Sequence, residues 1–561
     1  MQRGLYEAPG DEVVDDAPGA TPPDVDEPVG RDPRTEASAD GVRRRTRWAG
    51  VLLGLVATGG GLGVAELVVA LVRGSASPLV PVGQEFIDIT PAWLKDWAIQ
   101  VFGTGDKLAL VAGALVVILG LGSVVGMLAV RSAMGAAVAL TGAIGFVGAW
   151  AVLVRPEPSL AKLLPTTIGT VVSLLVLRWL APIARAACGA GGGGAISVPA
   201  PASAPDRRRF LTGAAGIGSS AVVSAVVGRI LRRRFEIDDE RSTLVLPDVV
   251  EPSATGAAEG SSLDVDGITP FVVPTGDFYR IDTALVVPQV SRDEWSLTIG
   301  GMVDRPRTYT FDDLLALPQM ERQATLSCVS NPVGGDLVGN AVWQGVSFAD
   351  VLRSAGIRDG ATQVVSRSVD GWTAGSPTEV IMDGRDAMLA YAMNGEPLPA
   401  EHGYPVRIVV PGLYGYVSAT KWVSEIELTR WEDFDAYWVP RGWSKTGPVK
   451  TMARIDTPRT GASRSGVVPV GGVAWAVHVG ISAVQVRIDG GEWIEAELGD
   501  VPSRDTWRQW VLRWDTSSVA PGEHVVEVRA LDGDGQPQPE QPKAVAPDGA
   551  QGYHRIRIET S

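Results

Sequence analysis

Histidine is scarce in this 561-residue chain, and basic residues are outnumbered by acidic ones. Only four histidines occur, and none of them precedes residue 402. The apolar segments of the N-terminal half therefore lack the histidine pair that a haem inside a bilayer would need. Lysine and arginine number 49 against 64 aspartates and glutamates, for a net charge of −15. That balance argues against a nucleic-acid partner, because proteins that bind nucleic acids in general present a basic surface.

Long apolar runs are abundant before residue 232 and rare after it. A helix needs about 20 apolar residues to cross a bilayer. The runs that meet or approach this length are Trp48–Val72, Leu108–Val130, Ala136–Val154, Leu163–Ile183 and the weaker Leu211–Val227. We predict a four-helix transmembrane region over residues 43–183 and a fifth span over residues 211–231. Residues 1–42 are acidic and rich in Pro and Gly, which predicts a disordered tail.

The distribution of arginines predicts the orientation of these spans. Arg43, Arg44 and Arg45 precede the first run and put the N-terminus in the cytoplasm. Five spans then place everything after residue 235 outside the cell membrane, although the arginines at 232–234 disagree with the rule. The only two cysteines, Cys188 and Cys328, fall on opposite sides, so no disulfide framework is expected.

The fifth span has a second interpretation. Arg207, Arg208 and Arg209 precede a mildly apolar Gly/Ala-rich run, in the manner of an internal twin-arginine export signal. The alternative is that they only anchor a helix at the cytoplasmic face. No small-residue cleavage site precedes residue 232, so we expect the span to stay as an anchor. Residues 184–210 and 232–264 are predicted linkers.

Alternating apolar residues and turns over residues 265–450 predict an α+β domain. Trp295–Ile299, Val364–Val369 and Val406–Val410 have the composition of strands. Thr310 is a predicted N-cap for a helix over Phe311–Leu317.

Cys328 lies in the most distinctive stretch of this domain. It ends a predicted strand that includes Ala324 and Leu326, and a Gly-rich loop over Asn331–Asn340 and a helix over Phe348–Ser354 follow. A lone thiol in such a loop suggests a metal-bound thiolate or a nucleophile. The alternative is a small buried apolar residue, which is the commoner role of free cysteine.

A second Gly-rich stretch, Pro411–Trp422, carries Lys421 and follows Arg407. Glycine backbone together with these two cations is suited to an anionic phosphate group. By itself the pattern is a weak signal and is more often a plain turn.

Taken together, the segments resemble the sulfite oxidase family of molybdopterin enzymes from about Ile268 to the C-terminus. The segments that carry the resemblance are FYRIDTALVVP at Phe278–Pro288, the SC-x-x-N stretch at Cys328, DGW at Asp370–Trp372, and NG-x-PLP…HG-x-PVR-x-VVPG within Ala390–Gly412. The resemblance implies a molybdenum–molybdopterin cofactor and oxygen-atom transfer to or from a small sulfur or oxide substrate.

Residue roles follow from the same resemblance. Cys328 matches the thiolate ligand of molybdenum, a soft donor for a soft metal. Arg407 and Lys421 match residues that hold the phosphate and the pterin, and His402 matches a contact on the pterin side, with a turn-capping histidine as its alternative. Further matches are Tyr279, Ser368 and Thr420 as polar contacts to the cofactor, and Arg280 and Tyr437 in the substrate pocket.

The sequence departs from the family directly after the cysteine. Sulfite oxidases carry a pattern like C-A-G-N-R-R there, whereas this chain has Pro332 and Val333 at the arginine positions. A less positive pocket puts tight sulfite binding in doubt. Periplasmic methionine-sulfoxide reductases are the alternative branch, although they usually lack a domain like residues 451–561. A non-enzymatic exported binding protein that keeps the fold is the third hypothesis.

No histidine precedes His402, so no cytochrome b5-like haem domain is expected. Electrons would then pass to a separate carrier, which could be a quinone, a cytochrome or a membrane subunit.

Residues 451–561 alternate and are interrupted by turns, which predicts a β-sandwich. The runs that alternate are Val473–Val479, Ala483–Gly490, Trp507–Asp515 and His524–Gly535. This part resembles the family's C-terminal immunoglobulin-like domain, which mediates dimers in several members, so a homodimer is a further expectation.

Overall fold

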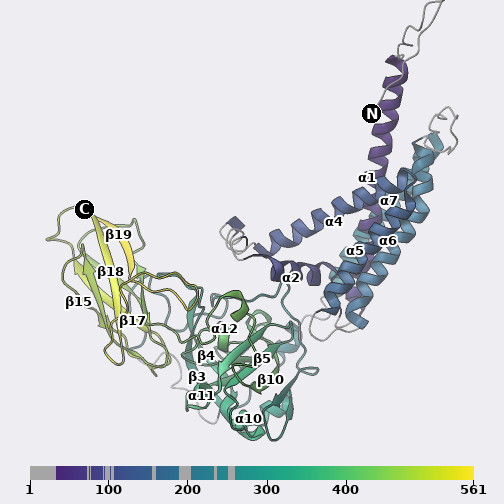
Figure 1. The fold of residues 1–561 in the computed structure, drawn as a ribbon. Helices are drawn as coiled ribbons and strands as arrows, with labels where there is room; N and C mark the ends of the chain where they lie inside the picture. Colours follow the sequence, from purple (N-terminus) through teal and green to yellow (C-terminus); the bar gives the residue numbers. More distant parts are fainter. Residues whose placement is uncertain are drawn as a thin grey trace, which may run out of the picture.

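The computed structural model describes residues 33–72, 75, 77–91, 94, 101–102, 106–154, 160–188, 204–232, 237–249 and 260–561. Three regions follow one another along the chain and along a bent path in space (Figure 1). We call them the helical region (α1 to α7, residues 33–232), the central region (β1 to β10, residues 296–429) and the C-terminal region (β11 to β19, residues 452–560).

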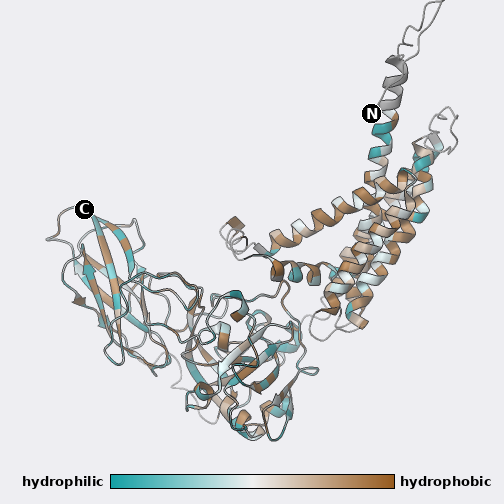
Figure 2. Ribbon diagram, in the orientation of Figure 1, coloured by the Kyte–Doolittle hydropathy of each residue, from teal (hydrophilic) through white to brown (hydrophobic). Residues whose placement is uncertain are grey.

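The helical region contains long apolar helices, which appear mostly brown in Figure 2. Its helices are α1 (Pro33–Leu71), α2 (Leu79–Ile89), α4 (Asp106–Val130), α5 (Met134–Leu153), α6 (Leu160–Ala187) and α7 (Ala204–Arg232). Among the described residues, all but α2 are long and apolar enough to cross a membrane by length and composition. These five helices coincide with the five predicted apolar runs.

One expectation for this region was wrong. Residues 33–42 were predicted to be disordered, but α1 begins at Pro33. Once a helix is nucleated, each added residue gains a hydrogen bond, so the apolar segment extends into the polar sequence before it. Helix α2, which lies between the first and second apolar runs, was not predicted. The tail over residues 1–32 and residues 189–203, 233–236 and 250–259 of the predicted linkers lie outside the described residues.

Helix α1 lies at the centre of the bundle and contacts α4, α6 and α7. Small residues allow its backbone to approach α4 closely. A Cβ atom added at Gly54 would lie 1.9 Å from the carbonyl oxygen of Gly122, so a larger residue at that crossing would separate the helices. Without a hydrophobic driving force inside a bilayer, such close contact is a main source of helix association.

The central region consists of two β-sheets connected by short helices. The first sheet has the order β2 (Arg307–Thr310), β1 (Ser296–Gly301), β10 (Val423–Thr429), β5 (Gln363–Ser368) and β6 (Thr373–Pro377). The second has the order β3 (Gln319–Ser327), β4 (Val338–Ser347), β7 (Met388–Met393) and β8 (Glu396–Pro397), with β9 (Arg407–Val409) paired to β7. The described helices from residue 237 to 450 are α8 (Asp238–Ser242), α9 (Phe311–Leu315), α10 (Phe348–Ala355), α11 (Thr378–Met382), α12 (Gly415–Ser418) and the 3₁₀ turns η3 (Ala400–His402) and η4 (Val439–Arg441).

The predicted strands and helices of this region are confirmed, with one correction. Thr310 caps α9 and forms a capping box with Asp313. The Gly-rich loop after Cys328 was expected to reach Asn340, but β4 already begins at Val338. The side chain of Asn340 is buried, with its Oδ1 atom accepting from the hydroxyl of Thr325 and its Nδ2 atom donating to the Phe271 carbonyl. These long-range partners hold a polar residue inside a strand, which local composition did not indicate.

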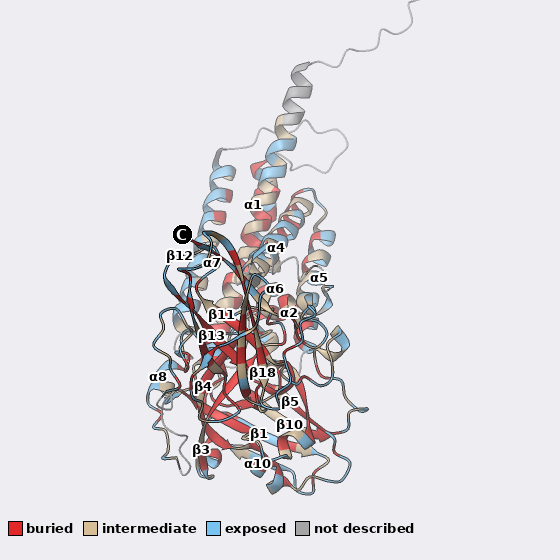
Figure 3. Ribbon diagram, turned by 90° about the vertical axis from the view of Figure 1, so that its left-hand side faces the viewer, coloured by how far each residue is buried: buried red, intermediate tan, exposed pale blue. Residues whose placement is uncertain are grey.

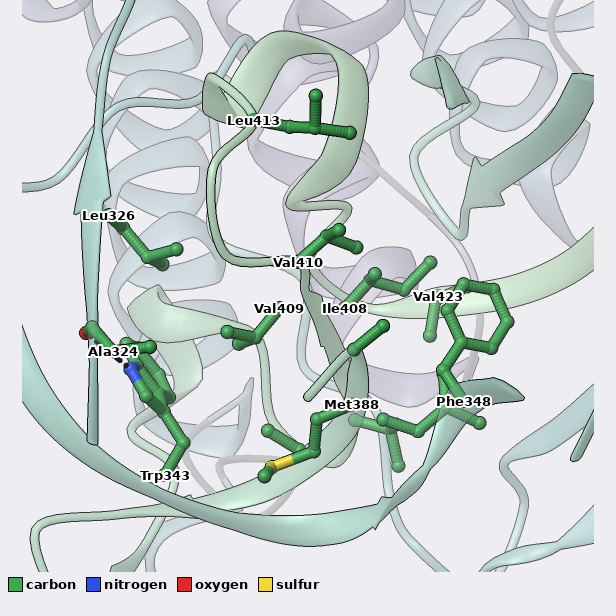
Figure 4. Packing of buried hydrophobic residues seen from close by; sticks show 14 of the residues in the cluster. Ala324, Leu326, Trp343, Phe348, Met388, Ile408, Val409, Val410, Leu413 and Val423 are labelled. Carbon is green, nitrogen blue, oxygen red and sulfur yellow. Dashed lines mark hydrogen bonds between the residues drawn. The ribbon is translucent and has the colours of Figure 1, made fainter. Parts of the chain in front are cut away.

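The core of the central region lies between the two sheets (Figure 4). Trp343, Phe348 and Met388 point into it and are almost fully buried. The indole nitrogen of Trp343 donates to the carbonyl oxygen of Ala324 at 3.1 Å, so its one polar group is satisfied. Burial of each such side chain contributes about 1.5 to 3 kcal/mol, and the packed core gives the loops at its edge a rigid base.

The C-terminal region has two further sheets that share one hydrophobic cluster. One sheet has the order β11 (Met452–Thr457), β13 (Val467–Trp475), β17 (Arg508–Asp515) and β16 (Glu497–Leu498). The other has the order β12 (Ser463–Arg464), β19 (His554–Thr560), β18 (Gly522–Asp532), β14 (Ile481–Ile488) and β15 (Ile494–Glu495). The four predicted alternating runs correspond to β13, β14, β17 and β18, whereas β19 was not predicted. In Figure 3 the strands of both β regions are largely buried.

Candidate active site

A cavity of about 150 Å³ opens in the central region, at the ends of its strands. This is roughly ten times the space that one water molecule needs. The lining includes seven residues that the sequence singled out, namely Tyr279, Arg280, Cys328, Ser368, His402, Arg407 and Lys421. They come from the loop before β1, the end of β3, the end of β5, η3, β9 and the segment before β10. The fold therefore brings together residues that lie up to 142 positions apart in the sequence.

Cys328 directly follows β3 and is a half-buried free thiol in the cavity wall. Its backbone nitrogen donates to the Leu337 carbonyl at 2.9 Å, which fixes the loop. Burial raises the pKa of the thiol, while the N–H and hydroxyl of Ser330 favour the thiolate and oppose that effect. A raised pKa does not suit a free nucleophile at neutral pH, but a metal can displace the thiol proton. The Ser330 contacts were not anticipated from the sequence.

Arg407 is a buried arginine whose hydrogen-bonding groups are largely unused. One terminal nitrogen donates to the His402 carbonyl at 3.2 Å, and the Nε atom has no partner among the described residues. The guanidinium lies 4.9 Å from the ring centre of Trp343, over its face. Burial lowers the pKa of Arg407 to about 10, so the group remains charged at neutral pH. A buried cation with spare donors is costly unless an anion binds there.

Lys421 contributes a second cation to the same wall. Its ammonium donates to Asp282 Oδ2 at 2.7 Å and to the Glu401 carbonyl at 2.9 Å. Burial lowers the pKa of Lys421 to about 8, although the Asp282 carboxylate partly offsets that effect. Asp282 did not emerge from the sequence as a site residue. Its position two residues after Arg280, in the same FYRID run, was the available signal.

His402 and Tyr279 are held neutral by burial. Burial, together with the nearby charges of Arg407 and Lys421, lowers the pKa of His402 to about 4. Burial also raises the pKa of the Tyr279 hydroxyl above its usual value. The His402 ring packs edge-on against Phe278, with ring centres 5.8 Å apart. Both side chains therefore offer hydrogen bonds without adding charge.

Thr420 and Tyr437 are not part of the cavity lining. The hydroxyl of Thr420 lies 2.6 Å from that of Ser366 in the buried interior behind the wall. Tyr437 stacks under the guanidinium of Arg441 at 3.7 Å, and the neighbouring Trp438 lines the cavity instead. Direct contact of either residue with a ligand in this cavity is therefore not supported.

Aromatic side chains form much of the remaining wall, and the sequence did not predict this. The aromatic lining residues beside Tyr279 are Phe278, Trp372, Tyr416, Trp422, Trp438 and Trp443. Their sequence positions are scattered, so no local pattern groups them. They give the cavity an apolar side that faces its cationic side.

The residues present fit a metal whose ligands come mainly from an organic cofactor. Among the described residues, no three His, Cys, Asp or Glu side chains gather to hold a metal ion. Cys328 would then be a single protein ligand. The unused donors of Arg407 and the ammonium of Lys421 fit the anionic part of such a cofactor.

Comparison with known proteins agrees with this site. The model of the oxidoreductase molybdopterin binding domain matches residues 284–438. An uncharacterized oxidoreductase, YuiH, from Bacillus subtilis is 37% identical over 154 residues, which cover 28% of this chain and 74% of that protein. Sulfite oxidase from Arabidopsis thaliana is 29% identical over 336 residues, covering 50% of this chain and 85% of that protein.

Among solved structures, the sulfane dehydrogenase SoxCD from Paracoccus pantotrophus aligns with a TM-score of 0.45 at 25% identity, covering 52% of this chain and 82% of that one. The residues matched by the family, 284–438, include Cys328, Arg407 and Lys421. The chain belongs to the sulfite oxidase family of molybdopterin-dependent oxidoreductases.

Proposed function

We propose that this protein is a membrane-anchored, outward-facing molybdenum enzyme that transfers an oxygen atom to or from a small substrate, as sulfite oxidases do. The observation that carries the proposal is the convergence of Cys328, Arg407 and Lys421 on one cavity, with donors of Arg407 left unused. A structural arginine would have its donors satisfied within the fold. Here they remain available to an anionic ligand.

The residues divide the work by their chemistry. Cys328 would supply the protein thiolate to molybdenum, and Arg407 and Lys421 would hold the anionic group of molybdopterin. When bound, the cofactor supplies the two-electron oxygen-atom transfer chemistry. His402, Tyr279 and Ser368 would orient the pterin through neutral hydrogen bonds, since burial keeps both rings uncharged. Arg280 lies at the rim, where it would meet a substrate anion.

A reductase of S-oxides or N-oxides, such as methionine sulfoxide, is the second candidate. Two observations favour it. Pro332 and Val333 replace arginines that sulfite oxidases carry, and Trp372, Trp438 and Trp443 give the cavity an apolar wall. A neutral substrate with a carbon substituent next to sulfur suits that wall better than a small dianion does.

The apolar helices support placement in the cell membrane as a multi-pass protein. With the N-terminus in the cytoplasm, five spans would put the central region on the outer side. Electrons would then pass to a separate carrier, either a quinone, a cytochrome or a membrane subunit. The shared core of the two C-terminal sheets supports an immunoglobulin-like domain, which would mediate a homodimer.

Elemental analysis of the purified full-length protein beside Cys328→Ser, coupled to fluorescence of the extracted oxidised pterin, tests the cofactor. We expect about one molybdenum per chain and pterin fluorescence in the wild type. Steady-state turnover with sulfite and with methionine sulfoxide then separates the two candidate substrates. A folded wild-type protein without molybdenum or pterin, made in a host that produces the cofactor, would favour the exported binding protein instead.

A further inference from the structure

Lys107, the second residue of α4, reaches out of the helical region and contacts the wall of the cavity. Its ammonium donates to Asp282 Oδ1 at 2.6 Å, to the Ala284 carbonyl at 2.8 Å and to the Asp282 carbonyl at 3.2 Å. An ammonium has three donor hydrogens, and this loop offers it three oxygen acceptors. The contact joins residues 175 positions apart.

Asp282 connects this contact to the site. Its carboxylate is only 4% exposed and lies 2.6 Å from Lys107 Nζ, 2.7 Å from Lys421 Nζ and 2.9 Å from Arg280 Nε. Burial alone would raise the pKa of Asp282, but Lys421 and Lys107 outweigh it and hold the pKa well below its usual range. The carboxylate therefore stays ionised and bridges Lys107 of the helical region and Lys421 of the cavity wall.

Helix α2 contacts the same loop. A Cβ atom added at Gly83 would lie 2.8 Å from Leu285 Cδ1, so the loop packs directly on the helix backbone. The segment over residues 280–285 is thus held by α4 through charge and by α2 through close packing. Figure 1 shows α2 between the other helices and the central region.

We propose that the helical region holds the cofactor site closed, with Lys107 and Asp282 as positioning residues for Lys421. Lys107 fixes Asp282, and Asp282 in turn fixes the ammonium that would meet the anionic group of the cofactor. The proposal rests on the proposed function, because it assigns Lys421 to the cofactor. It gives the helices a role beyond anchoring: they retain the cofactor.

The physical reason is the freedom that Lys421 gains without this bridge. A lysine side chain has many rotamers, and holding it in one costs up to about 2 kcal/mol. Asp282 holds it before the cofactor arrives, so the cofactor meets a preorganised cation. Without Lys107 the 280–285 segment loses its charged contact with α4, and the preorganisation is weakened.

Two measurements on the detergent-solubilised full-length protein test the proposal. The first is hydrogen exchange of peptides covering residues 279–287, and the second is the rate at which pterin fluorescence appears in the filtrate after dilution. The variants are Lys107→Met, the conservative Lys107→Arg, and Lys445→Met as a control. Lys445 makes a Lys–Asp ion pair of 2.7 Å with Asp435, and neither residue belongs to the helical region.

We expect Lys107→Met to speed the exchange of these peptides and to raise the pterin release rate about tenfold, as the loss of charge-assisted hydrogen bonds implies. Lys107→Arg should restore both within about twofold, and Lys445→Met should change neither. The proposal would be overturned if Lys107→Met released pterin at the wild-type rate. It would also be overturned if Lys107→Arg failed to restore slow release, or if Lys445→Met had an effect equal to that of Lys107→Met. If the wild type holds no pterin, the proposed function and the retention role fail together, and the exchange data still decide whether Lys107 docks the loop.

Discussion

Arg407 of the central region and Arg454 of the C-terminal region are both buried arginines, but their surroundings differ. Arg454 donates to Asp456 Oδ1 at 2.6 Å, to the Gly335 carbonyl at 2.9 Å and to the Thr269 hydroxyl at 2.8 Å. Arg407 makes one bond, to the His402 carbonyl, and its Nε atom has no partner among the described residues. No carboxylate forms an ion pair with Arg407 in the part of the chain that the structure describes, whereas Asp456 pairs with Arg454.

The difference is in how far each guanidinium is paired. Arg454 finds its partners within the fold, whereas Arg407 keeps hydrogen-bond donors that a ligand can use. In Arg454 the whole charge is compensated, so the residue can serve stability alone. In Arg407 the charge is buried at a cost that the fold does not recover by itself. The Arg454 side chain also donates to the carbonyl oxygen of Gly335, in the loop that follows Cys328. The C-terminal region therefore stabilises this loop.

The largest effect is expected for Cys328→Ser. We expect turnover with sulfite or a sulfoxide to fall by at least about a thousandfold, because a hydroxyl is a poor substitute for a soft thiolate ligand. The circular dichroism spectrum and the export of the protein should be unchanged. Full turnover in the variant would exclude Cys328 as the metal ligand.

The second largest effect is expected for a substitution of Arg454, whose charge is paired within the fold. Arg454→Met should lower the free energy of unfolding of the C-terminal transition by about 3 to 5 kcal/mol, because Asp456 is left buried without its cation. Thermal unfolding followed by near-ultraviolet circular dichroism measures this loss. Pterin content per folded molecule should stay close to that of the wild type. A small loss of stability would show that Arg454, like Arg407, contributes little to the stability of the fold.

The third effect is a pH dependence from Lys421. Its pKa of about 8 in the fold lies below the ordinary 10.5, so the unfolded chain binds the proton more tightly. Stability of the cofactor-free protein should therefore rise between pH 8 and pH 10.5, by at most about 3 kcal/mol. Unfolding midpoints compared with those of Lys421→Met isolate this contribution, since the variant lacks the titrating group. Parallel pH profiles of the two proteins would contradict it.

The smallest effect on stability is expected for Arg407→Met. Removing a cation with few partners should leave the cofactor-free protein as stable as the wild type, or more stable, by up to about 1 kcal/mol. Pterin content should nevertheless drop about tenfold, through loss of a charge-assisted contact to the cofactor. Chemical unfolding and pterin fluorescence on the same preparation measure both. A large loss of stability with full pterin content would show that Arg407 serves the fold, as Arg454 does, and not the cofactor.

Local patterns in the sequence were enough to predict the helical region, most strands of the two β regions, and the family through Cys328, Arg407 and Lys421. Apolar runs and alternation are local patterns, and the cofactor residues lie in short recognisable segments. The same segments also predicted Thr420 and Tyr437 as site residues, but neither lines the cavity. A position next to a site in sequence does not set the direction of its side chain.

The residues that complete the site could be identified from the folded chain alone. The aromatic wall comes from separate loops, and the bridge from Lys107 to Asp282 spans 175 positions. No periodicity links such residues. The loops around the cavity bring the aromatic side chains together, and packing of the helical region against residues 280–285 brings Lys107 to Asp282. The contrast between Arg407 and Arg454 is equally invisible in the sequence, since it depends on whether partners lie within hydrogen-bonding distance once the chain has folded.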